Sequence, residues 1–174
     1  MMEQVILVDE NDRQVGLMEK QAAHVNPHLH RAFSIFIFNS KGELLMQQRA
    51  LSKYHSPGLW TNTCCSHPRD GETLTEATSR RLMEEMGMTC EMHEVYTFIY
   101  KAPVGHGLTE HEFDHVWIGR SDETPQINRE EVESWKYMSL SDLKVDIQLH
   151  PELYTEWFKI TFEEMSHHAE LLGI

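Results

Sequence analysis

The chain has 174 residues, 40% of them hydrophobic and 25% charged, which suits one globular domain with a full core. A net charge of −13 argues against a general nucleic-acid binder, because such proteins neutralise phosphates with clustered Lys and Arg. No segment reaches the roughly 20 apolar residues of a membrane span, and the N-terminus lacks the basic lead of a signal peptide. The odd number of three cysteines suggests reduced thiols. We therefore expect a cytoplasmic protein without a membrane partner.

Short apolar or alternating runs that end at turn residues predict strands; in chain order they are Val5–Asp9, Gln14–Glu19, Arg31–Asn39, Glu43–Arg49, Leu59–Cys64, Glu91–Tyr100, Glu112–Gly119 and Glu133–Tyr137. Helical patterns cover Glu72–Met86, which Gly87 ends as a C-terminal cap, then Ser139–Asp146 and Pro151–Leu172, where Pro151 suits a first turn. Strands come first and helices pack on them later. The pattern predicts an α+β or α/β/α fold with a mixed sheet, in a single domain of residues 1–174.

The helix predicted over Glu72–Met86 carries two charged residues on its inward face. At about 100° per residue, one stripe faces the core, and it contains Leu74, Ala77, Thr78 and Leu82. Arg81 and Glu85 fall in the middle of this stripe, whereas Glu76, Arg80, Met83 and Glu84 point the opposite way. A surface ion pair between residues four apart is the alternative. A cation and a carboxylate aimed inward favour a bound ligand or metal.

Two further segments carry residues that suit a metal. In the strand TEHEF, Glu110 and Glu112 share one face and repel each other unless a cation lies between them; the alternative is a solvated edge strand. The segment HVNPHLH supplies histidines 24, 28 and 30, for which surface imidazoles are the alternative. With His67, these residues would form a mixed His/Glu site for a six-coordinate divalent ion rather than a Cys-rich zinc site.

The segment TNTCCSHP holds adjacent cysteines. The C-x-x-C spacing of a redox pair is absent. A zinc ribbon needs a second Cys/His pair, and Cys90 is a single cysteine. Cys65 and His67 share one face of an extended segment, so we predict that they point into a pocket and that Cys64 is buried and inert. The alternative is two core cysteines.

Four cations lie near these segments and would form a phosphate site if they converge; they are Lys20, Arg49, Lys53 and Arg81. Each of them taken alone is usually a surface charge, and Lys20 has the least support.

The runs ALSKYHSPGLWTNTCCSHP and GETLTEATSRRLMEEMG, the spaced His24 and His30, and Glu110-His111-Glu112 resemble the type I isopentenyl-diphosphate delta-isomerases of the Nudix superfamily. The resemblance runs from about residue 3 to the region of Trp157. The helix departs from the Nudix pattern, because Arg81 replaces the first carboxylate of its core and Ser66 replaces the usual opening glycine. The loss of a carboxylate disfavours a hydrolase and suits a protein that holds a diphosphate intact.

The resemblance implies an α/β/α Nudix-like sandwich that interconverts isopentenyl and dimethylallyl diphosphate by protonation and deprotonation. It implies a divalent ion (Mn²⁺, Mg²⁺ or Zn²⁺) at His24, His30, His67, Glu110 and Glu112, and a second Mg²⁺, bridging the diphosphate, at Glu85 and the main chain of Cys65. The proton chemistry would belong to Cys65, Glu112 and Tyr100, in an order that stays open. The diphosphate would lie at Lys20, Arg49, Lys53 and Arg81, and Trp157 would line the hydrocarbon end.

Several alternatives remain at this stage. His28 could replace a neighbouring histidine as a ligand, and Trp157 could belong to a core stripe with Leu153 and Ile160. The rival functions are a Nudix diphosphate hydrolase and a non-catalytic metal-binding or regulatory protein. The expected partner is a small-molecule diphosphate; the oligomeric state is open, with a monomer slightly favoured.

Overall fold

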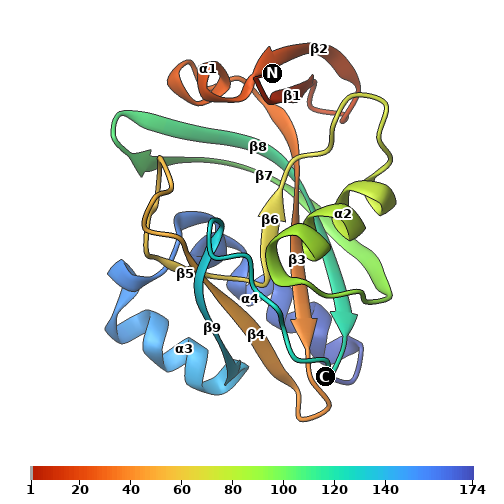
Figure 1. Cartoon of the computed structure of the whole chain (residues 1–174), viewed down its shortest axis with the longest axis vertical. Helices are drawn as coiled ribbons and strands as arrows, with labels where there is room; N and C mark the ends of the chain where they lie inside the picture. Colours follow the sequence, from red (N-terminus) through yellow and green to blue (C-terminus); the bar gives the residue numbers. More distant parts are fainter. Residues whose placement is uncertain (1) are drawn as a thin grey trace.

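A nine-stranded mixed sheet forms the centre of the part of the chain that the structure describes, residues 2–174 of a computed structural model (Figure 1). Met1, the first residue of the predicted domain 1–174, lies outside the described residues. The strands are β1 Gln4–Val8, β2 Gln14–Glu19, β3 His30–Phe38, β4 Glu43–Arg49, β5 Trp60–Thr61, β6 Cys64–Ser66, β7 Met92–Gly105, β8 Leu108–Arg120 and β9 Val132–Ser139. The helices are α1 Lys20–Val25, α2 Leu74–Met86, α3 Leu140–Leu149 and α4 Glu156–Leu171, with a 3₁₀ turn, η1, at Pro151–Leu153.

Strand β3 lies at the middle of the sheet and makes it mixed. It pairs in parallel with β8 and antiparallel with β1, β4 and β6. Its side chains are apolar on both faces, as the sequence predicts for a central strand. Ile35 and Ile37 pack on one face with Leu82 of α2, and Phe36 and Phe38 pack on the other with aromatic residues of α4.

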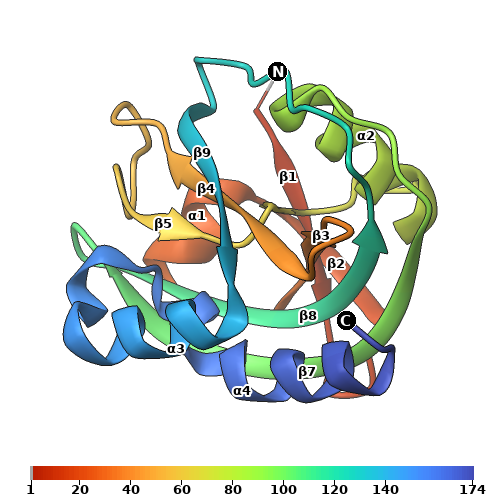
Figure 2. The ribbon, with the colours of Figure 1, turned by 90° about the horizontal axis from the view of Figure 1, so that it is seen from below.

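Helices therefore cover both faces of the sheet. Figure 2 shows α4 beneath the long β7–β8 hairpin and α2 on the other side. This arrangement confirms the predicted α+β class with its α/β/α layers. Among residues 2–174 no helix is both long and apolar enough to cross a membrane.

Helix α2 starts and ends where its capping residues place it. Thr73 and Glu76 form a capping box, so the helix begins at Leu74, two residues after the predicted start. Gly87 ends it with a φ of 61°, in the left-handed region, and its N–H bonds the carbonyl of Met83.

The predicted start of the C-terminal helix is wrong, and tertiary contacts explain it. Pro151 opens only the 3₁₀ turn η1, and α4 begins five residues later. The residues between them are extended because they bond to β5. The Thr155 N–H donates to the carbonyl of Trp60 at 3.0 Å, and the Thr155 hydroxyl donates to Thr61 at 2.8 Å.

The predicted strand Leu59–Cys64 also differs from the structure, and the helix at His24 was not predicted. The strand is divided into β5, which pairs with β4, and β6, which pairs with β3. His24 lies on the short helix α1, where the Glu19 carboxylate accepts from the first N–H groups. A six-residue helix spans less than two turns, so no periodic pattern announces it.

Candidate active site

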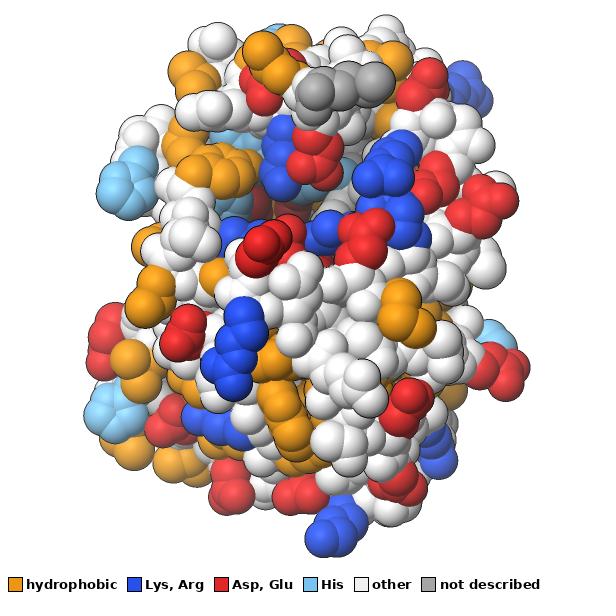
Figure 3. Space-filling model, viewed as in Figure 1, with side chains coloured by type: hydrophobic (Ala, Val, Ile, Leu, Met, Phe, Trp, Pro, Cys, Tyr) orange, Lys and Arg blue, Asp and Glu red, His pale blue; other side chains and the backbone are white. Residues whose placement is uncertain are grey.

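A pocket opens where α1, β6, β8 and the β4–β5 loop meet. Figure 3 shows it as a hollow in the upper half of this face, with basic, acidic and histidine side chains at its rim and inside. Every side chain that we predicted for the site lines it except Tyr100, His24 and His30, which lie in or beside its wall. The lining residues are Lys20, Phe33, Arg49, Lys53, Tyr54, His55, Cys65, Ser66, His67, Arg81, Glu85, Glu110, Glu112 and Trp157.

Strands β3 and β8 bring the predicted carboxylates to the predicted histidines. In the parallel register, His30 lies beside Glu112. The His30 Nε2 and His67 Nε2 atoms lie 3.2 and 2.8 Å from Glu112 Oε2. The His24 Nε2 atom lies 3.6 Å from Glu110 Oε1. We call these five residues, His24, His30, His67, Glu110 and Glu112, the His/Glu cluster.

The strand geometry of Glu110 and Glu112 is as predicted. Both are buried, with 4% and 5% of their surfaces exposed. The intervening His111 points away and contacts the carbonyl of Pro27. The solvated edge strand is therefore wrong for β8.

The imidazoles of the cluster are oriented as metal ligands are. Nδ1 of His24 bonds the carbonyl of Lys20 at 2.7 Å, and Nδ1 of His30 bonds that of His28 at 2.9 Å. These bonds aim the Nε2 atoms inward, where neither has a hydrogen-bond partner within residues 2–174 although both side chains are fully buried. A buried nitrogen without a partner is costly, and a divalent ion would satisfy it. The donor set therefore fits a divalent metal.

His28 is not part of this cluster. Its side chain is exposed, and only its carbonyl takes part, as the acceptor for His30. The three nitrogens that converge belong to His24, His30 and His67, whose ligand atoms lie within 4.8 Å of one another. His24 and His30 therefore lie in the cluster, and His28 lies outside it.

The protonation states suit coordination. Burial lowers the pKa of His67 to about 4, which keeps its imidazole neutral. Burial and repulsion from Glu112 act to raise the pKa of Glu110, but the nearby imidazoles of His24 and His55 outweigh them and lower it to about 2. A neutral imidazole and an ionised carboxylate are the forms that bind metals.

Tyr100 joins the two carboxylates. It faces Glu112 across the β7–β8 hairpin, and its hydroxyl lies 2.5 Å from Glu110 Oε2 and also bonds Glu112 Oε1. Burial raises the pKa of this phenol, so it remains a neutral donor. The predicted association of Tyr100 with Glu112 is thus present.

The two cysteines point to opposite sides of β6, as predicted. Cys64 is fully buried and donates to Glu85 Oε2 at 2.9 Å. Cys65 lies in the pocket wall, where its thiol donates to Asn62 Oδ1 at 3.1 Å. Burial raises the pKa of the Cys65 thiol and keeps it protonated.

Trp157 packs in the core cluster that α4 forms with the sheet and also lies against Cys65, but it is not part of a stripe with Leu153 and Ile160. Its indole N–H donates to the Cys65 sulfur at 3.1 Å, and the Arg49 guanidinium lies 5.3 Å from its ring centre. Leu153 and Ile160, the proposed members of such a stripe, are 45% and 51% exposed. The stripe alternative is wrong because Leu153 lies in η1, outside α4.

The four predicted cations converge at the rim and floor of the pocket, and acidic groups pair with three of them. Lys53 bonds Glu131. Arg81 and Glu85 both line the pocket, as predicted, and they also form the i,i+4 ion pair that was the alternative, at 3.2 Å; Arg81 lies 3.5 Å from Glu131. Arg49 instead donates to the carbonyls of the β4–β5 loop.

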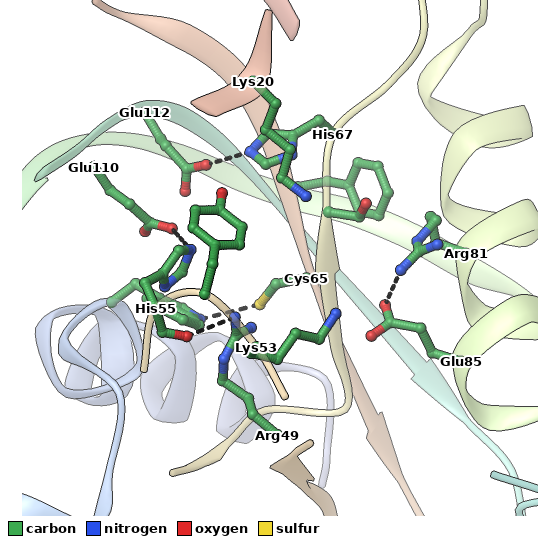
Figure 4. Close-up of a pocket in the computed structure, with 14 residues that line it drawn as sticks. Lys20, Arg49, Lys53, His55, Cys65, His67, Arg81, Glu85, Glu110 and Glu112 are labelled. Atoms are coloured by element: carbon green, nitrogen blue, oxygen red, sulfur yellow. Dashed lines mark hydrogen bonds and ion pairs between the residues drawn. The ribbon is translucent and has the colours of Figure 1, made fainter. Parts of the chain in front are cut away.

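Lys20, on α1, is the fourth of these cations, and its Nζ atom lies 3.3 Å from Glu3 Oε2. It lies on the pocket wall with the other three predicted cations. Figure 4 shows Lys20, Arg49, Lys53 and Arg81 around the same space as Cys65 and the two carboxylates.

The sequence reasoning missed four residues that shape the site. They are His55, Asn62, Asp114 and Glu131. A signal existed for Asp114, which shares the strand face of Glu110 and Glu112; it accepts from Ser34 at 2.8 Å, and burial raises its pKa. His55 stands inside the run YHSPGLW, but nothing in its spacing aims it at Glu110.

The fold defines the class of protein. The NUDIX domain family matches residues 28–158. The structure of DR0079 from Deinococcus radiodurans superposes with a TM-score of 0.71 at 23% identity, over 84% of this chain and 90% of that one. A MutT protein from Methanosarcina mazei Go1 gives 0.66 at 19% identity, over 80% and 94%. The chain is a Nudix-domain protein, and these two likenesses bear on the fold alone.

Sequence relatives narrow the class. The chain is 51% identical over 159 residues to the isopentenyl-diphosphate Delta-isomerase of Pectobacterium atrosepticum, which covers 91% of this chain and 89% of that protein. It is 52% identical over 173 residues to isopentenyl-diphosphate Delta-isomerase 2 of Aromatoleum aromaticum, over 99% and 92%. The chain belongs to the isopentenyl-diphosphate delta-isomerase family, as its motifs predict.

Proposed function

We propose that this chain is an isopentenyl-diphosphate delta-isomerase, an intramolecular isomerase that interconverts isopentenyl and dimethylallyl diphosphate by adding one proton and removing another. One observation carries the proposal: Cys65 and Glu112 line a single pocket that also holds four cations. A thiol and a carboxyl group can exchange protons with carbon on two sides of a bound alkene. The cations would hold the diphosphate.

The diphosphate end would lie at Lys20, Arg49, Lys53 and Arg81. Arg side chains suit bidentate contact with phosphate oxygens, and the ammonium groups add compact positive charge. Binding energy from this remote group would hold a short hydrocarbon in register between the reacting residues. Because Arg81 stands where Nudix hydrolases place a carboxylate, this arrangement favours retention of the diphosphate.

The His/Glu cluster would hold a divalent ion, Mn²⁺, Mg²⁺ or Zn²⁺. Glu85, with the main chain of Cys65, would hold a Mg²⁺ that bridges to the diphosphate. When bound, the first ion would fix one oxygen of Glu112 and lower its proton affinity, and the second would neutralise phosphate charge.

The chemistry of this chain's own residues follows from their positions. One group donates a proton to the terminal carbon of the double bond, which leaves a tertiary carbocation. The group on the other side removes a proton from the adjacent CH₂, and those C–H electrons form the new double bond. Cys65 acts on one side and Glu112, with Tyr100, on the other. The two groups exchange roles when the reaction runs in reverse.

The surroundings protect such a cation from water. Trp157 is 3% exposed and covers the sulfur of Cys65, so the reacting carbons would lie against an aromatic side chain rather than solvent. The Tyr100 hydroxyl would hold the Glu112 carboxyl group in one orientation while it gains or loses a proton.

The test is incubation with isopentenyl diphosphate and Mg²⁺ in D₂O, followed by NMR. Deuterium in the dimethylallyl product is the expected result. Release of phosphate without deuterium would instead establish a hydrolase, and metal binding without any turnover would establish a non-catalytic protein. We further propose that the enzyme acts in the cytoplasm, where its three free thiols would stay reduced.

A further inference from the structure

His55 lies in the β4–β5 loop yet belongs to the wall of the His/Glu cluster. Its side chain is buried, and its Nε2 atom lies 3.2 Å from Glu110 Oε1 (Figure 4). Its ring stacks on that of His24, with centroids 5.5 Å apart and planes at 26°. His55 is therefore held in place on two sides, by a carboxylate and by a ring that would ligate a metal.

With His55 included, each carboxylate of the cluster has two imidazoles. His24 and His55 approach Glu110, at 3.6 and 3.2 Å, just as His30 and His67 approach Glu112. Two histidines and one carboxylate with open positions form a recurrent site for a divalent metal. The ligand atoms of His24, His55 and Glu110 lie within 4.8 Å of one another.

The orientation of the rings favours a cation over a plain hydrogen bond. Nδ1 of His55 lies 3.3 Å from the Ser56 hydroxyl, which leaves Nε2 aimed at the pocket. A hydrogen bond from His55 to Glu110 would account for that pair alone. It leaves the fully buried Nε2 of His24 without any partner among the described residues, whereas a cation between the three groups satisfies all of them.

We propose that His55 is a further ligand for the divalent cation of the His/Glu cluster, on the side of His24 and Glu110. This inference rests on the metal site of the proposed function. Because His55 raises the number of nitrogen donors to four, the site prefers borderline ions such as Zn²⁺ or Co²⁺ over Mg²⁺, which favours oxygen ligands.

The experiment is a titration of chelator-treated, full-length protein with Co²⁺ alone. Its visible absorption reports the ligand set, and paramagnetic NMR shows one shifted ring N–H signal for each bound imidazole. The variants are His55→Ala and His55→Gln, with His28→Gln as the control because His28 is exposed and outside the cluster. A glutamine at position 55 can still donate to Glu110 but is a poor metal ligand.

We expect both His55 variants to weaken Co²⁺ binding by roughly 10- to 100-fold, to change the absorption spectrum and to lose one shifted signal, while His28→Gln matches the wild type. If His55→Gln retains the wild-type affinity and all the shifted signals, His55 only orients Glu110 and the proposal is overturned. Failure of the wild type to bind Co²⁺ would also overturn it.

A further variant distinguishes failure of the His55 proposal from failure of the proposed function. His30→Gln, taken from the other half of the cluster, would lose Co²⁺ binding whether or not His55 is a ligand. Loss with His30→Gln but not with His55→Gln rejects His55 as a ligand and leaves the isomerase proposal intact. Circular dichroism of each variant confirms that it is folded.

Discussion

The indole N–H of Trp157 donates a hydrogen bond to the sulfur of Cys65 at 3.1 Å. The bond joins α4, near the C-terminus, to the short strand β6. It fixes the side of the sulfur that faces the pocket, and a donor at the sulfur stabilises the thiolate relative to the thiol. Trp157 is therefore more than an apolar wall, because it would tune the proton affinity of Cys65.

Replacement of Trp157 by Phe should lower turnover while the ring remains. The variant keeps an aromatic face but loses the N–H, and a hydrogen bond contributes about 1 kcal/mol, so kcat should fall roughly fivefold with KM little changed. Steady-state kinetics measure this effect. Trp135→Phe is the control, since Trp135 packs with the other core cluster, beside α2. Equal kcat values for Trp157→Phe and the wild type would show that the bond has no catalytic role.

Asn62 has the complementary role on the same sulfur. Its amide nitrogen donates to the carbonyls of Ile35 and Cys64, at 3.0 and 3.1 Å, so its oxygen must face Cys65. Asn62→Ala removes the buried amide that donates to these two carbonyls and should reduce the free energy of unfolding by about 1–3 kcal/mol. It should also reduce kcat, because the thiol loses its fixed acceptor.

Urea unfolding and kinetics on the same preparation separate the two effects of Asn62→Ala. The exposed Asn26 offers a matched control, Asn26→Ala, for which both quantities should stay at wild-type values. Loss of stability with full turnover in folded protein would reduce Asn62 to a purely structural residue.

The adjacent cysteines should respond differently to the same substitution. Cys65→Ala removes a proton-carrying group and should lower turnover by about 100-fold or more. Cys64→Ala removes only a buried hydrogen bond to Glu85, which should cost less than about tenfold. Turnover under saturating substrate and Mg²⁺ measures both. A comparable loss at Cys64 would contradict the assignment of the two faces of β6.

The positions of several side chains in the site can be predicted from the sequence, because side chains alternate between the two faces of a strand. The two-residue period of an extended chain places Glu110 and Glu112 on the same face of a strand. The same period places Cys64 and Cys65 on opposite faces. The path of the β4–β5 loop has no such period, so the approach of His55 to Glu110 was invisible. The start of α4 was equally hidden, because the bonds from Thr155 to β5 join segments far apart in the sequence.

Glu131 should compete with the substrate for two of its cations. It bonds Lys53 and lies 3.5 Å from Arg81. Glu131→Gln removes this charge, and because a partly exposed ion pair contributes up to about 1 kcal/mol, the variant should bind diphosphate roughly fivefold more tightly. Calorimetric titration with inorganic diphosphate measures the change.

The neighbouring Glu130 supplies the control for this charge effect. It is exposed and, within the described residues, forms no ion pair with the four cations, so Glu130→Gln should change diphosphate binding less than Glu131→Gln does. The same gain in affinity from both variants would point to general charge reduction rather than to competition at Lys53 and Arg81.

Gly87 should be the more sensitive of the two glycines that flank α2. Its φ is 61°, and a Cβ there would lie 2.4 Å from the carbonyl oxygen of Gln126. At Gly71 the φ is 80° but nothing lies within 4 Å of the added atom. Alanine in the left-handed region costs about 1–2 kcal/mol at either position, and only at Gly87 must the backbone also shift. We therefore expect urea unfolding to show a larger loss of stability for Gly87→Ala than for Gly71→Ala.

Because α2 presents Arg81 and Glu85 to the pocket, the shift at its C-terminal end should also weaken diphosphate binding. Equal losses of stability in the two variants would mean that the Gln126 segment yields without cost, and the predicted effect on binding would then disappear as well.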